Sequence, residues 1–428
     1  MTKVLGIAFL FSFTVAVALA TTTPRRIIAK TTGDSSGSAS SSTTPSARTS
    51  AKSKKSKSIG RKTSAHGKTQ SVRQASLKGV PIAVATKYAK AKTRSARRTT
   101  WRETPPVDPT IGDDSRGEDP VVRQAAVEAL GSLTGSMVVV NPNTGRILTI
   151  VNQKLALNGY QPCSTFKPAV ALAALEEGVI ENDHTRLRLG NKWYMDLTQS
   201  LAHSNNVYFA KLGTLLGLSK LREYGQSFGF GEQAGWGIEE EPTGRLPLEP
   251  PPASQGGVGK VASFGMGISQ TPLQLVSFVS AVANGGTLYY LQYPKTSEGQ
   301  ENFAPRVKRK LDIGRWLEPV RQGMLEAVLF GTARRAHQPD MTILGKTGSC
   351  SQDGMKLGWF AGYSDHEKGL AVAVLQRTIQ PMGGGPHAAE VAGRLFRRLS
   401  DQHYFANSAD KVTAGGTPSA TLRMPLSR

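Results

Sequence analysis

The feature that most restricts how this 428-residue chain can fold is a long basic segment near its N-terminus. Residues 21–104 contain 20 Lys and Arg but only two acids, Asp34 and Glu103, and are rich in Ser, Thr and Ala. Such a segment cannot bury enough apolar surface to offset the entropy lost on ordering. We therefore predict a basic disordered linker over residues 21–119, a folded domain over 120–402 and a disordered tail over 403–428.

The net charge of +22 lies mainly in that linker, because residues 21–104 alone contribute +18. Such a basic chain first suggests nucleic acid as a partner. Residues 1–20, however, combine an early lysine, an apolar run and small residues at the end, the pattern of a signal peptide. The apolar run is at the short limit for a bilayer span, so a membrane anchor is the alternative.

Export excludes nucleic acid and predicts a location in the periplasm or at the outer face of the cell membrane. There, residues 21–104 could bind anionic envelope polymers or lipid head groups. A plain spacer explains the same composition equally well.

Downstream of the linker, the sequence predicts a domain of both helices and strands. β-Branched runs on either side of residues 141–145 indicate a hairpin, and Thr271 followed by Pro272 is a typical helix start. The last three strands have no helices between them and should be antiparallel. The expected helices cover residues 121–130, 169–177, 197–202, 207–213, 219–228, 272–283, 317–330 and 388–400, and the expected strands cover 136–140, 146–151, 341–348, 357–363 and 370–376.

The first candidate site is the segment at residues 161–168, which leads into an apolar helix. Ser164 and Lys167 lie one helical turn apart on one face. A serine hydroxyl becomes a nucleophile when a neighbouring amine of lowered pKa accepts its proton. The motif alone is weak evidence, because Ser408 and Lys411 repeat it in the polar tail. A helix cap beside a solvated lysine is its simpler interpretation.

Two further motifs follow. Ser204 and Asn206 interrupt a helical segment, where an ordinary N-cap is the simpler explanation. Lys346, Thr347 and Gly348 end a predicted strand, and a cation beside a hydroxyl suits a carboxylate ligand. Ser-x-x-Lys, Ser-x-Asn and Lys-Thr-Gly in this order are the motifs of penicillin-recognising serine enzymes.

With these motifs, residues 120–402 resemble the transpeptidase domain of penicillin-binding proteins, in the serine acyltransferase superfamily that includes class A and class D β-lactamases. The resemblance implies the penicillin-binding/β-lactamase-like fold, an α/β fold of the α+β type. An antiparallel sheet is then packed between helices, with a helical subdomain. Residues 263–275 are more similar to penicillin-binding proteins than to any β-lactamase class. Other similar stretches are residues 162–168, 228–231, 283–286, 331–332 and 358–362.

This resemblance implies a serine D,D-transpeptidase or carboxypeptidase that acts on peptidoglycan stem peptides and binds β-lactam antibiotics. Ser164 would attack the D-Ala-D-Ala carbonyl and become acylated. Lys167 would act as its base, and Ser204 would relay the proton to the leaving D-alanine. No cofactor and no metal are expected.

The resemblance also implies the substrate-binding groups. Asn206 would hold Lys167 and the substrate amide, and the Lys346–Thr347–Gly348 motif would hold the terminal carboxylate. The backbone N–H groups of Ser164 and Ser349 would form an oxyanion hole, in which one lost donor typically costs about 3 kcal/mol of barrier.

The chain departs from the family at two positions. Cys163 stands where glycine is usual, and Cys350 stands where a small residue is usual. Certain carbapenem-hydrolysing class A β-lactamases are similar in joining the corresponding positions by a disulfide. We therefore predict a Cys163–Cys350 disulfide that braces the oxyanion hole, with two buried free thiols as the alternative.

Two other functions remain open. A β-lactamase would differ only in hydrolysing the acyl group quickly, but the chain has no Glu-x-x-Leu-Asn pattern of class A, and class D enzymes usually have Val in place of Asn206. A β-lactam sensor or cell-wall-binding protein without turnover is the non-catalytic alternative, and the complete set of motifs argues against it.

Overall fold

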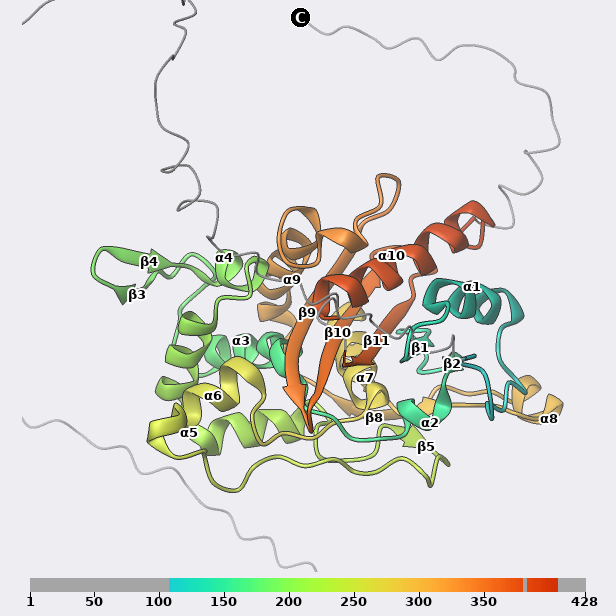
Figure 1. Cartoon of the computed structure of the whole chain (residues 1–428), viewed down its shortest axis with the longest axis horizontal. Helices are drawn as coiled ribbons and strands as arrows, with labels where there is room; N and C mark the ends of the chain where they lie inside the picture. Colours follow the sequence, from blue (N-terminus) through green and yellow to red (C-terminus); the bar gives the residue numbers. More distant parts are fainter. Residues whose placement is uncertain (1–107, 380–382, 407–428) are drawn as a thin grey trace, which may run out of the picture. The chain divides into compact units, whose positions relative to one another are not determined.

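The computed structural model describes residues 108–379 and 383–406 of the chain (Figure 1). The predicted signal or anchor, the predicted linker up to residue 107 and residues 407–428 of the predicted tail lie outside these residues. Residues 403–406 of that predicted tail are described, and Phe405 among them is buried in a core cluster. None of the helices in the two described ranges has the length and hydropathy needed to span a bilayer.

Five antiparallel strands form the central sheet, in the order β2-β1-β11-β10-β9. They are β1 (Gly135–Val140), β2 (Ile147–Val151), β9 (Ile343–Gln352), β10 (Met355–Ser364) and β11 (Ala371–Thr378). The predicted hairpin and the antiparallel pairing of the last three strands are confirmed. β9 extends beyond the expected residue 348, because residues 349–352 continue to pair with β10. As the edge strand, β9 leaves one side of its backbone open.

Helices cover both faces of this sheet, as the side-chain alternation of the strands requires. On one face, Val139 and Val374 belong to a core cluster with α1 (Pro120–Leu130) and α10 (Gly385–Asp401). On the other face, Val138 and Leu375 pack in a second cluster with α3 (Lys167–Glu176) and α7 (Pro272–Ala283). Figure 1 shows α10 and α7 on opposite sides of β9–β11. The expected fold, a sheet packed between helices, is confirmed.

The helical subdomain follows β2 in the chain. Its main helices are α3, α4 (Leu197–Ala202), α5 (Asn206–Ser227) and α6 (Gly257–Phe264), and α4 also packs against α9 (Gly314–Leu329). α5 joins the two helices expected around residues 207–228, with a kink at Gly217, whose φ is 78°. α6 was not predicted, because Gly257 and Gly259 lie in its first turn and glycine lowers helix propensity.

Shorter elements complete the described chain. The helical ones are α2 (Gln153–Ala156), η1 (Cys163–Phe166), η2 (Ala253–Gln255), α8 (Ser297–Glu301) and η3 (Arg334–Ala336). The strands are β3 (Leu187–Gly190), β4 (Trp193–Met195), β5 (Gly235–Trp236), β6 (Thr287–Tyr289), β7 (Leu291–Gln292) and β8 (Val307–Lys310). β3 pairs with β4, β5 with β7 and β6 with β8.

The predicted start of the domain at residue 120 is corrected by the structure. Asp113 and Glu118, expected in the linker, are buried carboxylates that form ion pairs with Arg123 at 2.9 and 3.1 Å. Asp113 also accepts the backbone N–H groups of Asn152 and Gln153. These acids therefore bind β2 and α2 to α1, and residues 108–119 belong to the fold. The composition of a Pro- and Gly-rich stretch does not reveal such long-range partners.

Candidate active site

Ser164 lies in the one-turn helix η1, directly before α3 begins at Lys167. The sequence predicted Ser164 in the first turn of the α-helix, but Ser164 lies in the 3₁₀ turn before it. α3 itself has Pro168 in its first turn, where the missing N–H of proline has no helical partner to lose. Ser164 is 8% exposed, and its Oγ is 3.5 Å from the carbonyl oxygen of Ser263 in α6. Ser164 thus lies at a largely closed junction between η1, α3 and α6.

Lys167 has a fully buried side chain with three polar neighbours. Its Nζ donates hydrogen bonds to the carbonyl oxygen of Ser204 at 2.6 Å and to Oδ1 of Asn206 at 2.7 Å. It also lies 3.0 Å from Oγ of Ser204 and 5.3 Å from the centroid of the Phe209 ring. The structure therefore excludes a solvated lysine here and brings together the first and second predicted motifs.

The break between α4 and α5 presents Ser204 and Asn206. The N-cap of α5 is Asn205, whose side chain accepts the N–H of Tyr208. Asp196 caps α4 in the same way, by accepting the N–H of Gln199. Since Asn205 performs the capping, the side chains on either side of it are available to Lys167. Ser204 adopts a left-handed backbone with φ of 54°, a conformation that is uncommon outside glycine and often marks functional sites.

The Lys-Thr-Gly motif lies within β9, beside η1. Lys346 is 1% exposed, and its Nζ donates to the carbonyl oxygen of Thr347 at 3.0 Å. Gly348 permits close packing, because an added Cβ would lie 2.9 Å from the carbonyl oxygen of Pro162. The structure thus brings the third motif against the segment that carries Ser164.

Burial lowers the pKa of both site lysines. Removal from water lowers the pKa of Lys167 from its ordinary value to about 6, and the nearby positive charge of Lys346 adds to this effect. Burial likewise lowers the pKa of Lys346 to about 7. At neutral pH, Lys167 is therefore mostly the free amine, which can accept a proton.

The hydrogen bonds of Lys167 indicate where that proton would come from. A neutral amine has two N–H groups and one lone pair. The two acceptor-only partners, the Ser204 carbonyl and Asn206 Oδ1, take the N–H groups. The lone pair is then left for a hydroxyl proton, and the hydroxyl within reach is that of Ser204, whose Oγ lies 3.0 Å from Lys167 Nζ.

Cys163 at the start of η1 and Cys350 in β9 lie close together. Their Cα atoms are 5.6 Å apart, within the usual range for a disulfide, and the structure joins them through their sulfur atoms. Cys163 has φ of 54°, a backbone region that glycine occupies more readily. The two cysteines directly adjoin Ser164 and Ser349, the two residues whose N–H groups were expected to form the oxyanion hole. The side chain of Ser349 accepts the N–H of Gly385 at 2.8 Å and so faces α10.

Sequence reasoning missed two residues that contact the site. Oγ1 of Thr332 is 2.7 Å from Oγ1 of Thr347, and the Thr332 N–H donates to the carbonyl oxygen of Ala202 at 3.1 Å. The loop at Thr332 therefore connects β9 with the end of α4. Phe209 contacts Lys167 through its ring. In the sequence, residues 331–332 are marked only by the family resemblance. An aromatic residue at helical spacing, such as Phe209, has the pattern of an ordinary core residue.

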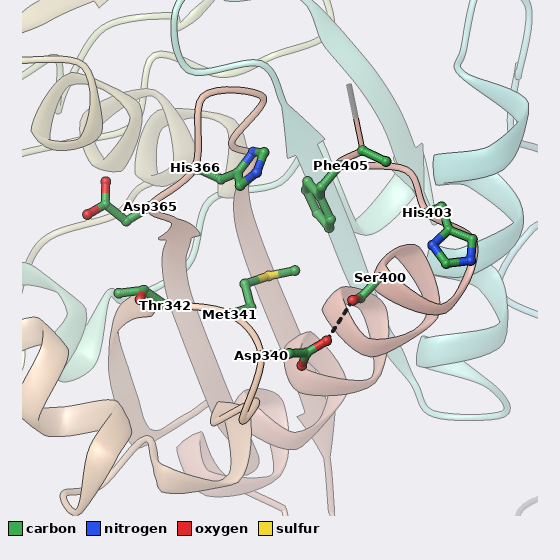
Figure 2. Close-up of a pocket in the computed structure, with 9 residues that line it drawn as sticks. Asp340, Met341, Thr342, Asp365, His366, Ser400, His403 and Phe405 are labelled. Carbon is green, nitrogen blue, oxygen red and sulfur yellow. Dashed lines mark hydrogen bonds between the residues drawn. The ribbon is translucent and has the colours of Figure 1, made fainter. Parts of the chain in front are cut away.

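A separate surface depression of about 410 Å³ lies near the end of the described chain. Figure 2 shows Asp340, His366, Ser400 and Phe405 around it. Asp340 already accepts hydrogen bonds from Ser400 and Arg397, both at 2.8 Å. Across residues 108–379 and 383–406, no group of three or more His, Cys, Asp or Glu side chains is arranged to hold a metal ion.

A family model described as the penicillin-binding protein transpeptidase domain matches residues 135–397. The chain therefore belongs to the family of penicillin-binding protein transpeptidase domains. The three predicted motifs all lie within the matched residues.

Several named proteins are similar to this chain. Stage V sporulation protein D of Bacillus subtilis is 31% identical over 319 residues, which cover 61% of this chain and 48% of that protein. Peptidoglycan D,D-transpeptidase MrdA of Acinetobacter baumannii is 24% identical over 370 residues, which cover 68% of this chain and 54% of that protein. The chain thus spans about half the length of these relatives.

Solved structures agree on the fold. The transpeptidase domain of penicillin-binding protein 3 from Burkholderia pseudomallei has a TM-score of 0.58 at 19% identity, covering 68% of this chain and 95% of that domain. At this identity, the likeness concerns the fold alone.

Proposed function

We propose that the chain is a serine D,D-transpeptidase that acts on peptidoglycan stem peptides ending in D-Ala-D-Ala. The observation that carries this proposal is the buried Lys167 amine, which has a pKa of about 6 and binds Ser204 and Asn206 one turn from Ser164. Family membership and the relatives named as peptidoglycan D,D-transpeptidases support it.

In the acylation step, Lys167 takes the proton of Ser164 Oγ as that oxygen attacks the carbonyl carbon of the penultimate D-alanine. The negative charge that develops on the carbonyl oxygen is accepted by the backbone N–H groups of Ser164 and Ser349. The peptide C–N bond then breaks, and the proton passes from Lys167 through Ser204 Oγ to the leaving D-alanine nitrogen. Ser164 is left as an acyl ester.

In the second step, the amine of a neighbouring stem peptide attacks the ester. The same groups work in reverse: Lys167 and Ser204 remove the amine proton and return one proton to Ser164 Oγ. The products are a cross-linked peptide and the free enzyme. Water in place of the amine gives carboxypeptidase activity, and a β-lactam in place of the stem peptide gives a long-lived acyl-enzyme.

Lys346 and Thr347 bind the terminal carboxylate in this proposal, and Gly348 allows the substrate to approach the β9 backbone. A bound carboxylate raises the pKa of Lys346 above its free value of about 7, because the negative charge favours the ammonium form. The substrate therefore induces the charged state that binds it.

We also propose export and a Cys163–Cys350 disulfide in the mature protein. Relatives named for peptidoglycan synthesis support a site of action outside the cytoplasm, where disulfides persist. A bond across a sequence separation of 187 residues is worth about 5 kcal/mol in the chain-entropy model, and usually less. Mass spectrometry of the unreduced, envelope-purified protein should find the two peptides linked; two free thiols would rule the bond out. Residues 21–104 are proposed to bind anionic polymers or head groups of the envelope.

A β-lactamase requires a fast route for water to the acyl ester. Residues 239–241 are a run of three glutamates, the residue type that class A β-lactamases use for this step. Glu241 is buried, and its carboxylate accepts the Gly235 N–H and the Thr271 hydroxyl, both at 2.7 Å. It therefore stabilises the start of α7, and this arrangement favours the transpeptidase.

The proposal is tested with a synthetic stem peptide ending in D-Ala-D-Ala and a second peptide with a free amine. Wild-type protein should release D-alanine and form the cross-linked dimer. Ser164→Ala should lose at least about 10³-fold in rate, as expected when a covalent nucleophile is removed. Ser408→Ala is the matched control, because it alters the second Ser-x-x-Lys motif and should leave the rate unchanged. Equal rates for wild type and Ser164→Ala would refute the proposal.

A further inference from the structure

The β3–β4 hairpin exposes two aromatic side chains. Figure 1 shows it extending from the helical subdomain beside α4. Trp193 and Tyr194 in β4 are each 42% exposed. Isolated two-stranded hairpins are only marginally stable in water. Large aromatic rings exposed on such a hairpin indicate a surface that binds a partner.

The rings lie on opposite faces of the hairpin. Tyr194 is paired with Arg188, so both point to the same face, and the Arg186 guanidinium lies 5.9 Å from the Tyr194 ring centroid. Trp193 is the next residue along β4, so its side chain points to the other face, over Gly190 at the tip. One flat partner surface would cover only one of these rings.

The charge of the hairpin is entirely positive. Arg186, Arg188 and Lys192 are exposed, and residues 184–195 contain no acid. No carboxylate in the described chain forms an ion pair with any of these three cations. The acids that border this range in sequence are Asp183, which lies 3.8 Å from His184 Nε2, and Asp196, which caps α4.

We propose that this hairpin inserts its tip into the head-group layer of an anionic lipid bilayer. Trp and Tyr favour the bilayer interface, where the ring meets acyl chains and the polar edge meets water. Lys and Arg beside them attract anionic head groups. Insertion by the tip covers both faces, which explains the aromatic residues on both. The proposal rests on the proposed export, which places the domain in the compartment that the outer face of the cell membrane borders.

The test measures amide hydrogen exchange of the full chain with vesicles of phosphatidylcholine alone and of phosphatidylcholine mixed with phosphatidylglycerol. Residues 21–104 are expected to hold all variants on the anionic vesicles, so binding itself is not the readout. The amides of β3 and β4 should exchange about tenfold more slowly on the anionic vesicles only. Trp193→Ser combined with Tyr194→Ser should abolish this protection.

Trp236→Ser is the matched control, because Trp236 is 50% exposed in β5 and lies outside the hairpin; it should keep the protection. Arg188→Glu with Lys192→Glu is a second test that spares the rings and should also remove it. Each variant should bind fluorescent penicillin at the wild-type rate, which shows that it is folded and separates this proposal from the catalytic one. Vesicle-bound protein with an unprotected hairpin would overturn the inference. So would protection by soluble peptidoglycan fragments without vesicles.

Discussion

The candidate active site and the β3–β4 hairpin contain the same pair of groups, a cation beside an aromatic ring, in opposite environments. In the active site, Lys167 lies 5.3 Å from the Phe209 ring and is fully buried. In the hairpin, Arg186 lies 5.9 Å from the Tyr194 ring and is exposed. Burial lowers the pKa of Lys167 to about 6 and makes it a base. The guanidinium of Arg186 is instead open to contact from outside the domain.

The comparison shows that burial, more than residue type, decides whether a cation of this basic protein can act as a base or can contact a partner. Of the many cations in the described chain, Lys167 and Lys346 stand among the largest fully buried side chains. Changes in the active site should therefore alter rates, and changes in the hairpin should alter only where the protein binds.

The largest effect should come from removing the buried amine. Lys167→Met keeps the length and the apolar stem but has no lone pair to accept the Ser164 proton. The rate of acylation by fluorescent penicillin should fall by about 10³-fold, the usual range for a lost general base. Lys154→Met, at an exposed lysine outside the active site, is the matched control and should label at the wild-type rate. A less than tenfold loss in Lys167→Met would show that another group is the base.

An intermediate effect is expected from pH. Acylation of the free enzyme needs Lys167 neutral and Lys346 charged. The second-order rate constant should therefore rise through pH of about 6 and fall again above about 7, which gives a bell-shaped profile. At saturating β-lactam the alkaline limb should shift upward, because the bound carboxylate raises the pKa of Lys346. A rate that rises with pH up to about 10 would mean that Lys167 keeps an ordinary lysine pKa.

The smallest effect on catalysis should come from the hairpin. Trp193→Ser combined with Tyr194→Ser changes only exposed rings, and surface substitutions usually alter free energy by less than about 0.5 kcal/mol. Stopped-flow labelling with penicillin should stay within about twofold of wild type. A large loss of labelling in a folded variant would show that the hairpin takes part in acylation, and the contrast between the two regions would disappear.

Much of the fold could be predicted from local sequence. Thr271 followed by Pro272 correctly marked the start of α7. The last three strands were predicted because apolar runs with short polar breaks leave little choice but antiparallel pairing.

The missed features depend on contacts between distant residues. Asp113 and Glu118 seemed solvated in a Pro- and Gly-rich stretch, yet both pair with Arg123. The protruding β3–β4 hairpin has a register shift between Arg188 and Gly190, and its short strands give little periodic signal.

The candidate site likewise combines features that the sequence predicts with features that depend on contacts between distant residues. The order of the three motifs predicted which residues meet at the site. The family resemblance supplied their roles. The burial of Lys167, its three polar neighbours and the contact between Thr332 and Thr347 needed the structure, because pKa and hydrogen bonding depend on the whole environment.

The most direct test of the central claim is a pulse-chase of penicillin on the full chain, followed by intact-mass and peptide mass spectrometry. After a short pulse with benzylpenicillin and removal of free drug, wild-type protein should carry one adduct on the peptide that contains Ser164. That adduct should persist for hours, and Ser164→Ala should carry none. An adduct lost within seconds would identify a β-lactamase, and absence of any adduct on the wild type would contradict the acyl-enzyme site.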